Sequence, residues 1–409
     1  MIEKAYVHIL NGSEQILCAV VAVSGKTARF RYGKSYLQRS DAFPLDPINL
    51  PLVDQEFNVT NKDGMFGVLM DMGADSWGRK LISRYHEKTP KNNLEMLLAT
   101  GSMGVGSLML STSRQATKPK NYMFEIADID ALKRASKQVI LNQDIDIAIR
   151  DKAIHDSGLG GARPKFTVIG DGKVYIAKFA KPNDALSFAN LEHASLEIAK
   201  EMDINVAKSK IYEPKEQGNN VLLVERFDVA SGLPRKHMIS ARSLFNQSVV
   251  NNKTAFKHYS YGRLAEIIQS KCGDRAISDS RELYRRMVFN VFLGNTDDHA
   301  QNHALAYDLE DKQWLLSPCY DIMPISNSKM HGIALGKHGR EATLDNILSM
   351  HRMFCLSKSE AIKVIKQCQE LQAELPVLFE KHGVSEQDAL VAKKLLPSIT
   401  KSLELKRDI

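Results

Sequence analysis

Three polar side chains, Asp297, Asn302 and Asp321, place the strongest constraint on what this chain can fold into. Asn302 follows Asp297 by five positions, and Asp321 comes after a predicted β-hairpin. In a phosphotransferase of this layout, the first Asp orients or deprotonates the attacking hydroxyl, and the Asn and second Asp bind Mg²⁺ on the ATP phosphates. Carboxylate and amide oxygens suit Mg²⁺. The spacing therefore predicts a catalytic aspartate and two magnesium ligands.

The hairpin is predicted from two short runs, 303–308 and 313–316, on either side of the polar segment 309–312. It returns the chain, so we expect Asp321 to lie near Asn302. An isolated Asp and Asn at this spacing more often cap a turn than bind a metal. The prediction therefore depends on the elements that precede it in the chain.

A glycine-rich segment and a strand lysine precede this motif. Segment 157–166, SGLGGARPKF, is followed by Lys178 in the apolar run VYIAKFA. A strand lysine neutralises nucleotide phosphates, and a glutamate on the next helix commonly pairs with it; Glu192 is the first candidate and Glu197 the second. Glycines let backbone N–H groups approach phosphate. The segment lacks the P-loop pattern GxxxxGK[ST], and alone it is equally consistent with a flexible turn.

Segment 221–228, VLLVERFD, predicts an apolar strand that leaves into a charged turn. In a hinge between two lobes, the backbone bracketed by Glu225 and Phe227 would contact an adenine edge. An ordinary strand end has the same local pattern. The order of all these elements along the chain is what favours a kinase-like site.

The pattern of the whole chain predicts an α+β fold with more than one core, because 409 residues exceed the size of a typical single core. Asn11-Gly12 and Ser24-Gly25 predict hairpins in a β-meander. Further elements are predicted at 75–82, 92–99, 129–140, 166–169, 174–179 and 188–202, with mainly helices beyond 240. We expect a two-lobed kinase-like fold, with a β-rich N-terminal subdomain and a mainly helical C-terminal lobe, divided as 1–120, 121–235 and 236–409.

Composition excludes several classes of protein. The hydrophobic fraction of 44% and charged fraction of 25% are those of a globular chain, and the apolar run 16–23 is far shorter than the roughly 20 residues of a membrane helix. The N-terminus lacks a secretory signal pattern, so we expect a cytoplasmic protein. Five cysteines without CxxC spacing indicate buried thiols rather than disulfides or a zinc site.

The net charge of +7 is spread along the chain, apart from a basic bias at its C-terminal end. The bias comes from Lys393, Lys394, Lys401, Lys406 and Arg407. Such a bias is usually the solvated face of a last helix, and contact with a DNA backbone is the alternative.

The chain resembles the HipA family of bacterial serine/threonine kinase toxins. Segments 30–52 and 66–88 and the run MGVGSLML at 103–110 are similar to the N-terminal part of the family. GGARPK, LVERFD, TDDHAQN and SPCYD match its catalytic core. The catalytic motifs are specific, and the N-terminal ones moderately so.

The resemblance implies roles for individual residues. Asp297 becomes the catalytic aspartate, Asn302 and Asp321 the Mg²⁺ ligands, and Lys178 the phosphate-binding lysine. The implied nucleotide-binding residues are Gly160, Gly161, Ala162, Arg163, Pro164 and Lys165 in the loop, Glu225, Arg226 and Phe227 in the hinge, and His299, Ala300, Gln301 and Tyr320 beside the metal ligands. The family autophosphorylates a serine at the start of the loop; here Gly158 occupies that position and Ser157 precedes it, so Ser157 is the candidate.

The resemblance also implies ATP and Mg²⁺ as cofactors, a small helix-turn-helix antitoxin like HipB as partner, and a protein substrate such as an aminoacyl-tRNA synthetase. DNA would be contacted only through the antitoxin, and no membrane is involved. Two alternatives stay open. One is a weakly catalytic co-repressor in an antitoxin–DNA complex. The other is a small-molecule or lipid kinase, because His299 makes the loop DxHxxN, similar to the phosphatidylinositol kinases.

Overall fold

A computed structural model describes residues 1–100, 104–115, 123–216, 218–245 and 258–399. The chain forms two compact units, each assembled from segments that are separate in the sequence. Unit 1 comprises Met1–Ala189, Ala207–Val249 and Ala304–Ser317, and unit 2 comprises Asn190–Val206, Val250–His303 and Pro318–Ile409. Of the basic residues near the C-terminus, Lys401, Lys406 and Arg407 lie outside the described residues.

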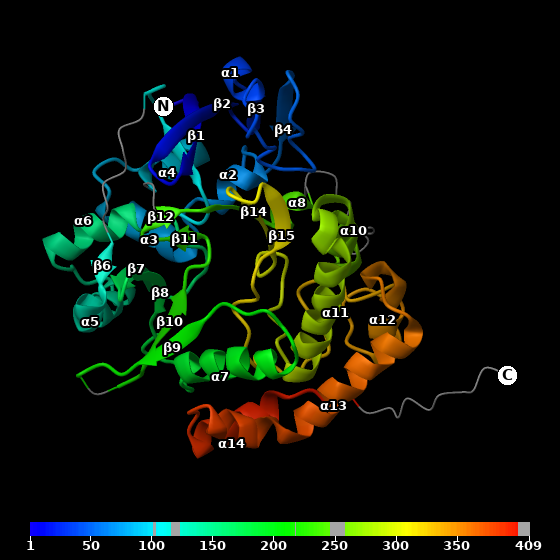
Figure 1. Cartoon of the computed structure of the whole chain (residues 1–409). Coiled ribbons are helices and arrows are strands. Elements are labelled where there is room, and N and C mark those ends of the chain that lie inside the picture. The colour runs from blue at the N-terminus through cyan, green and yellow to red at the C-terminus, as the bar shows by residue number, and fades with distance from the viewer. Residues whose placement is uncertain (101–103, 116–122, 217, 246–257, 400–409) are drawn as a thin grey trace. The chain divides into compact units, whose positions relative to one another are not determined.

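The first sheet of unit 1 is antiparallel and has the strand order β4-β3-β2-β1-β5 (Figure 1). Its strands are β1 (Lys4–Asn11), β2 (Glu14–Ser24), β3 (Thr27–Tyr32), β4 (Glu56–Thr60) and β5 (Leu108–Ser111). The two predicted hairpins are confirmed, with loops one residue later than expected. Gly12 and Gly25 are the first loop residues, at φ of +58° and +59°, a conformation that glycine adopts without strain.

The second sheet of unit 1 has the order β6-β7-β8-β10-β9, and all its pairs except β6–β7 are antiparallel. Its strands are β6 (Phe124–Glu125), β7 (Lys165–Gly170), β8 (Lys173–Lys178), β9 (Ser209–Tyr212) and β10 (Val221–Glu225). One face packs on α3 (Ser76–Tyr85), α5 (Ile129–Ile140) and α6 (Ile147–His155). The helix predicted at 129–140 is confirmed, and its buried apolar residues recur at helical spacing along one stripe.

The hairpin predicted at 303–316 is also confirmed. It consists of β14 (Ala304–Asp308) and β15 (Gln313–Leu316), and β13 (Lys236–Ser240) adds a third strand that the sequence pattern did not reveal. Ser317 N donates to Ala304 O at 3.0 Å and closes the base of the hairpin. The remaining elements of unit 1 are α1 (Lys34–Leu37), α2 (Gly67–Asp71), α4 (Asn93–Ala99), α8 (Ala241–Leu244), β11 (Val229–Ala230), β12 (Leu233–Pro234) and the 3₁₀ turn Ile126–Asp128.

Unit 2 is built from helices around α11 (Ala276–Leu293), which is buried on nearly all sides. Helices α10 (Tyr261–Lys271) and α13 (Lys358–Lys381) pack against it. The other helices in the described part of unit 2 are most of α7 (Phe188–Glu201), α12 (Leu344–Leu348), α14 (Glu386–Leu395) and the 3₁₀ turns Gly273–Arg275 and His351–Phe354.

The α+β class is confirmed, and the three-part division of the chain stays a prediction. All five cysteines are free thiols and four of them are buried, as expected. No helix within the described ranges is long and apolar enough to cross a membrane.

Candidate active site

The glycine-rich loop in unit 1 is held by the start of α3. Gly161 N donates to Asp75 Oδ2 at 3.0 Å, and Gly161 O accepts from Trp77 N at 3.2 Å. Gly161 has a φ of +99°, which a residue with a side chain rarely adopts. Burial would raise the pKa of the Asp75 carboxyl, but hydrogen bonds from the backbone of Gly161 and Ser76 outweigh it and hold that pKa below its usual value. Asp75 is therefore an anionic anchor for the loop.

Two lysines of this unit lie directly opposite each other. In the β7–β8 pair, Lys165 is the partner of Lys178, so both side chains start on the same face of the sheet. The Lys165 ammonium donates to the carbonyl of Gly160. Tyr175 and Ala177 of β8 face the helix-covered core, which places Lys178 on the other face. Both lysines therefore place positive charge on this face of the sheet.

The rest of the loop is fixed by local pairs. Arg163 Nη1 and Nη2 donate to the Asp184 carboxylate at 2.6 and 3.2 Å, and its guanidinium lies 3.8 Å from the centre of the Phe188 ring. Pro164 O accepts from Phe179 N at 2.9 Å. Ala162 lies between these anchors. The loop is thus held by contacts to both ends of segment 179–188, which follows β8.

The predicted hinge contains a buried ion pair. The Arg226 side chain is 2% exposed and donates to Asp228 Oδ2 at 2.6 Å and to Gly104 O at 2.8 Å. Asp228 Oδ2 also accepts from Gly106 N at 2.8 Å. Glu225 pairs with Lys173 at 2.8 Å, and Phe227 packs at the edge of a small apolar cluster. The Arg226 side chain is therefore structural, and its backbone N–H is also engaged, because it donates to Val174 O at 2.8 Å.

Ser157, the candidate for autophosphorylation, is 1% exposed. Its Oγ has no hydrogen-bond partner among the residues that the structure describes. Gly78 of α3 lies so close that an added Cβ would be 1.9 Å from Ser157 O. A kinase active site cannot reach this hydroxyl until the segment that carries Ser157 moves away from α3.

The predicted catalytic loop of unit 2 pairs an exposed aspartate with a buried one. Asp297 is exposed, whereas Asp298 is 1% exposed. Asp298 Oδ2 accepts from the Tyr261 hydroxyl, and Oδ1 accepts from His303 Nε2 at 2.8 Å. Asn290 Nδ2 donates to the Tyr261 hydroxyl at 3.3 Å. The buried carboxylate thus fixes the backbone that presents Asp297 to solvent.

The segments that carry the three predicted residues share anchors within unit 2. Gly294 O, at the end of α11, accepts from Ile325 N and Ser326 N at 3.0 and 3.1 Å. Tyr320 Oη donates to Gln301 O at 3.1 Å. These bonds tie the chain around Asp321 to the loop around Asn302, as the hairpin predicts.

A second set of hydrogen bonds holds the chain just before Asp321. Cys319 N donates to Asn205 O at 2.8 Å, and Asn205 N donates to Glu282 of α11 at 3.2 Å. Asp321 itself has a φ of +59°. That conformation costs a non-glycine residue of the order of 1–3 kcal/mol and is common at functional sites.

The donor chemistry of Asn302 and Asp321 suits a magnesium ion. Asn302 Nδ2 donates to Asp297 O at 3.4 Å, so the amide oxygen is the atom left to act as a ligand. Asp321 adds a carboxylate. Within the described residues no group of three or more His, Cys, Asp and Glu could hold a metal, so an ion here would keep water or phosphate as its other ligands.

The other predicted residues of unit 2 take up supporting places. Ala300 N donates to the Tyr259 hydroxyl at 3.3 Å, and His299 O accepts from Asn302 N at 2.9 Å. His299 Nδ1 has no partner within the described part of the chain. Glu192 is a buried residue of α7, and its pairing with Lys178 stays a prediction.

Sequence reasoning missed the residues that support the site. Asp298 stands beside Asp297, yet its partner Tyr261 is 37 positions away. Asp75 lies 86 positions before Gly161. No local pattern signals such pairs.

Comparison with known proteins gives matches over most of the chain. The HipA-like C-terminal domain matches residues 157–375, more than half of the chain, and the HipA N-terminal domain matches residues 14–111. A Haemophilus influenzae protein named "Putative kinase" is 24% identical over 161 residues. That match spans 37% of this chain and only 45% of the relative.

A solved structure from Shewanella oneidensis agrees with this at the level of the fold. A chain of the Shewanella oneidensis MR-1 complex of the toxin–antitoxin proteins HipA and HipB with operator DNA superposes with a TM-score of 0.70 at 16% identity, covering 96% of this chain and 95% of that one. The Helicobacter pylori proinflammatory kinase CtkA gives a TM-score of 0.42 at 12% identity, over 56% and 88% of the two chains. The resemblance seen in the sequence is confirmed, and the chain belongs to the HipA family.

Proposed function

We propose that this protein is a kinase that transfers the γ-phosphate of ATP to a serine or threonine of another protein, and that it acts as the toxin of a toxin–antitoxin pair. The observation that carries the proposal is the catalytic loop of unit 2. It presents Asp297 to solvent while the neighbouring Asp298 is buried and holds the loop in place.

In the proposed reaction, the Asp297 carboxylate accepts a hydrogen bond from the substrate hydroxyl. As the hydroxyl oxygen bonds to the γ-phosphorus, the bond from that phosphorus to the β–γ bridging oxygen breaks, the proton passes to Asp297, and ADP leaves. Asn302 and Asp321 would hold Mg²⁺, which offsets negative charge on the phosphates when it is bound. Positioning and electrostatics supply most of the rate.

The nucleotide phosphates are assigned to the lysine pair of unit 1. Lys165 and Lys178 face each other in register, and ammonium groups are donors that bind phosphate oxygens strongly. The hinge backbone at 225–227 is assigned to the adenine. Glu192 is the proposed ion-pair partner of Lys178, because a buried carboxylate requires a cation or donors.

The partner and substrate follow from the family. One solved relative is a complex with HipB and operator DNA, which supports a HipB-like antitoxin as the partner of this chain. We propose an aminoacyl-tRNA synthetase as the class of protein substrate. We propose that Ser157 is autophosphorylated only after its segment moves, because the side chain is buried and cannot react where it lies.

The test is a phosphate-transfer assay with labelled ATP and Mg²⁺, on the purified protein alone and with a cell extract. Replacing Asp297 by Asn should lower turnover about 10²–10⁴-fold, while ATP binding stays nearly intact. Asp321→Asn should also weaken binding of Mg-ATP. Asp274→Asn, at another exposed aspartate of unit 2, is the matched control and should keep full activity.

Label on a serine or threonine of an extract protein that requires Asp297 would establish the activity. Equal labelling by wild type and Asp297→Asn would refute the assignment of the catalytic residue. A folded wild-type protein that binds ATP and transfers no phosphate would favour the co-repressor.

A further inference from the structure

Unit 1 contains a polar pocket that shares no residue with the proposed phosphotransfer site. The pocket has a volume of about 360 Å³ and lies between the β2–β3 hairpin, the turn after β4, α3 and the start of α4. Four cationic side chains line it: Lys26, Lys62, Arg79 and Lys91. Asp63 is the carboxylate residue among the lining residues.

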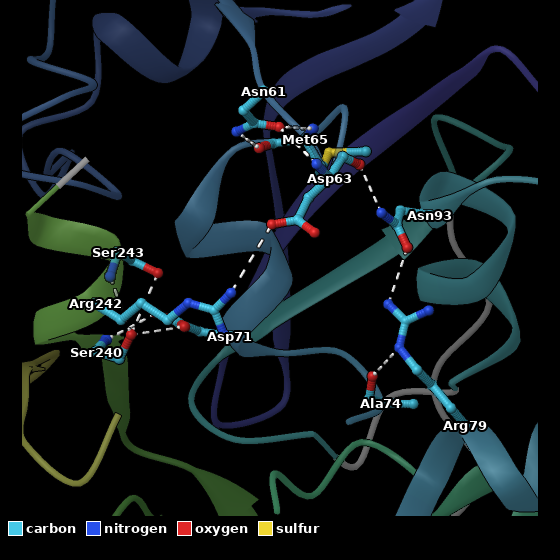
Figure 2. A network of polar contacts seen from close by, with 10 residues as sticks. All are labelled: Asn61, Asp63, Met65, Asp71, Ala74, Arg79, Asn93, Ser240, Arg242 and Ser243. Carbon is cyan, nitrogen blue, oxygen red and sulfur yellow. Dashed lines mark hydrogen bonds and ion pairs between the residues drawn. The ribbon is translucent and has the colours of Figure 1, made fainter. Parts of the chain in front are cut away.

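The turns that carry two of the lysines are packed tightly against each other. Gly64 has a φ of +58°, and an added Cβ would lie 3.1 Å from Gly25 O and 3.3 Å from Lys26 Cα. The side chain of Asn61 closes the turn, because Oδ1 accepts from Asp63 N at 3.1 Å and Nδ2 donates to Met65 O at 2.9 Å (Figure 2). Lys26 and Lys62 therefore extend from a fixed backbone.

Arg79 is fixed as well. Its Nε donates to Ala74 O at 3.1 Å, and Nη2 donates to Asn93 Oδ1 at 2.9 Å (Figure 2). Asn93 Nδ2 in turn donates to Asp63 O. The other terminal nitrogen of Arg79 has no contact with the residues drawn in Figure 2, so a held guanidinium keeps donors for a ligand.

The lining has more positive than negative side chains, and its one carboxylate is paired outside the pocket. The Asp63 carboxylate is directed to Arg242, with Oδ2 3.9 Å from Nη2, and Arg242 does not line the pocket (Figure 2). The nearby Glu95 accepts from Ile2 N and Lys91 N. Lys91 has a charge interaction with Glu95, and the pocket still contains four cationic side chains against the single carboxylate of Asp63, so an anionic ligand would balance the excess positive charge.

We propose that this pocket binds a small phosphorylated anion, such as a phosphate monoester or a diphosphate. A fixed guanidinium and several ammonium groups are the donors that bind phosphate oxygens most strongly. The volume is that of a pocket for a small molecule. A nucleic acid is disfavoured because its backbone is bound along an extended basic surface rather than in one concave pocket.

The experiment is a calorimetric titration of the full chain with inorganic pyrophosphate, without Mg²⁺, at low and at physiological salt. Each titration is repeated in Lys178→Gln, so that pyrophosphate bound at the proposed nucleotide loop is recognised and subtracted. The test variant is Lys26→Gln combined with Lys62→Gln, two exposed side chains that no fold contact requires. The control is Lys137→Gln, an exposed lysine of α5 in the same unit.

We expect the double variant to bind pyrophosphate at least tenfold more weakly than wild type while its melting temperature is unchanged. We expect Lys137→Gln to bind like wild type, and binding to weaken as salt rises. Equal affinity in the double variant and the control would overturn the proposal. A DNA duplex that binds through Lys26 and Lys62 and is not displaced by pyrophosphate would assign the pocket to nucleic acid and overturn the ligand class.

Discussion

Replacing Asp298 by Asn should loosen the catalytic loop without touching Asp297. The Asp298 carboxylate receives two buried donors, the Tyr261 hydroxyl and His303 Nε2. Asparagine keeps one acceptor oxygen and presents an NH₂ group in place of the other. The amide oxygen would accept from the Tyr261 hydroxyl, and the NH₂ group would face His303 Nε2. His303 then has to move its proton to Nδ1, which has no partner among the described residues, or lose its hydrogen bond.

The magnitude follows from those two contacts. A buried polar group without a partner costs about 1–3 kcal/mol, and a hydrogen bond to a charged acceptor contributes about 1.5–3 kcal/mol. We expect Asp298→Asn to lower the free energy of unfolding by about 2–4 kcal/mol. In a domain of roughly 150–250 residues, each kcal/mol lowers the melting temperature by about 2–4 °C.

The assay combines thermal unfolding with phosphate-transfer kinetics. A positioning role predicts that kcat falls while KM for ATP changes little, because the loop that presents Asp297 is disturbed and the proposed nucleotide contacts of unit 1 are not. The conservative variant Asp298→Glu keeps both acceptors and should retain more activity than Asp298→Asn. Unchanged stability and kcat in Asp298→Asn would refute the role of the buried carboxylate.

Two further predictions concern the segment before the glycine-rich loop. Burial raises the pKa of Asp156 from 3.8 to about 7, so the folded chain keeps a proton that the unfolded chain releases. The free energy of unfolding should therefore fall as pH rises from about 4 to 7, by at most about 1.4 kcal/mol per pH unit. Asp156→Asn should remove that fall in chemical unfolding measured across this range. Parallel pH profiles of wild type and Asp156→Asn would contradict the prediction. Gly78→Ala should cost about 1–3 kcal/mol in thermal unfolding, since its Cβ would meet Ser157 O at 1.9 Å, whereas Gly160→Ala, with nothing within 4 Å, should be neutral.

Much of the fold could be predicted because its signals are local. The Asn-Gly and Ser-Gly pairs predicted two hairpins, and the apolar stripe at 129–140 predicted α5. The hairpin between Asn302 and Asp321 followed from two short runs and a polar turn. In each case a few neighbouring residues determine the backbone, so their pattern is sufficient.

The strand β13 and the buried pairs could not be predicted in this way. β13 exists because it pairs with β14, which lies far along the chain. Arg226 donates to Gly104 O across 122 positions, and nothing near either residue indicates the other. Such contacts are made by the tertiary fold, and a charged residue next to a strand has the same local pattern whether it becomes buried or solvated.

The pairing of Lys165 with Lys178 is intermediate between the local signals and the long-range contacts. Asp171 and Gly172 form a two-residue turn, and such a turn fixes the register of both strands. Counting six residues outward from each side of the turn gives Lys165 and Lys178, so their opposition follows from the sequence once the turn is placed. The lysines of the polar pocket have no such rule, because Lys26 and Lys62 meet through two separate turns whose packing depends on Gly64. A pair of lysines on one hairpin can thus be found from sequence, whereas a pair brought together by two separate turns requires the structure.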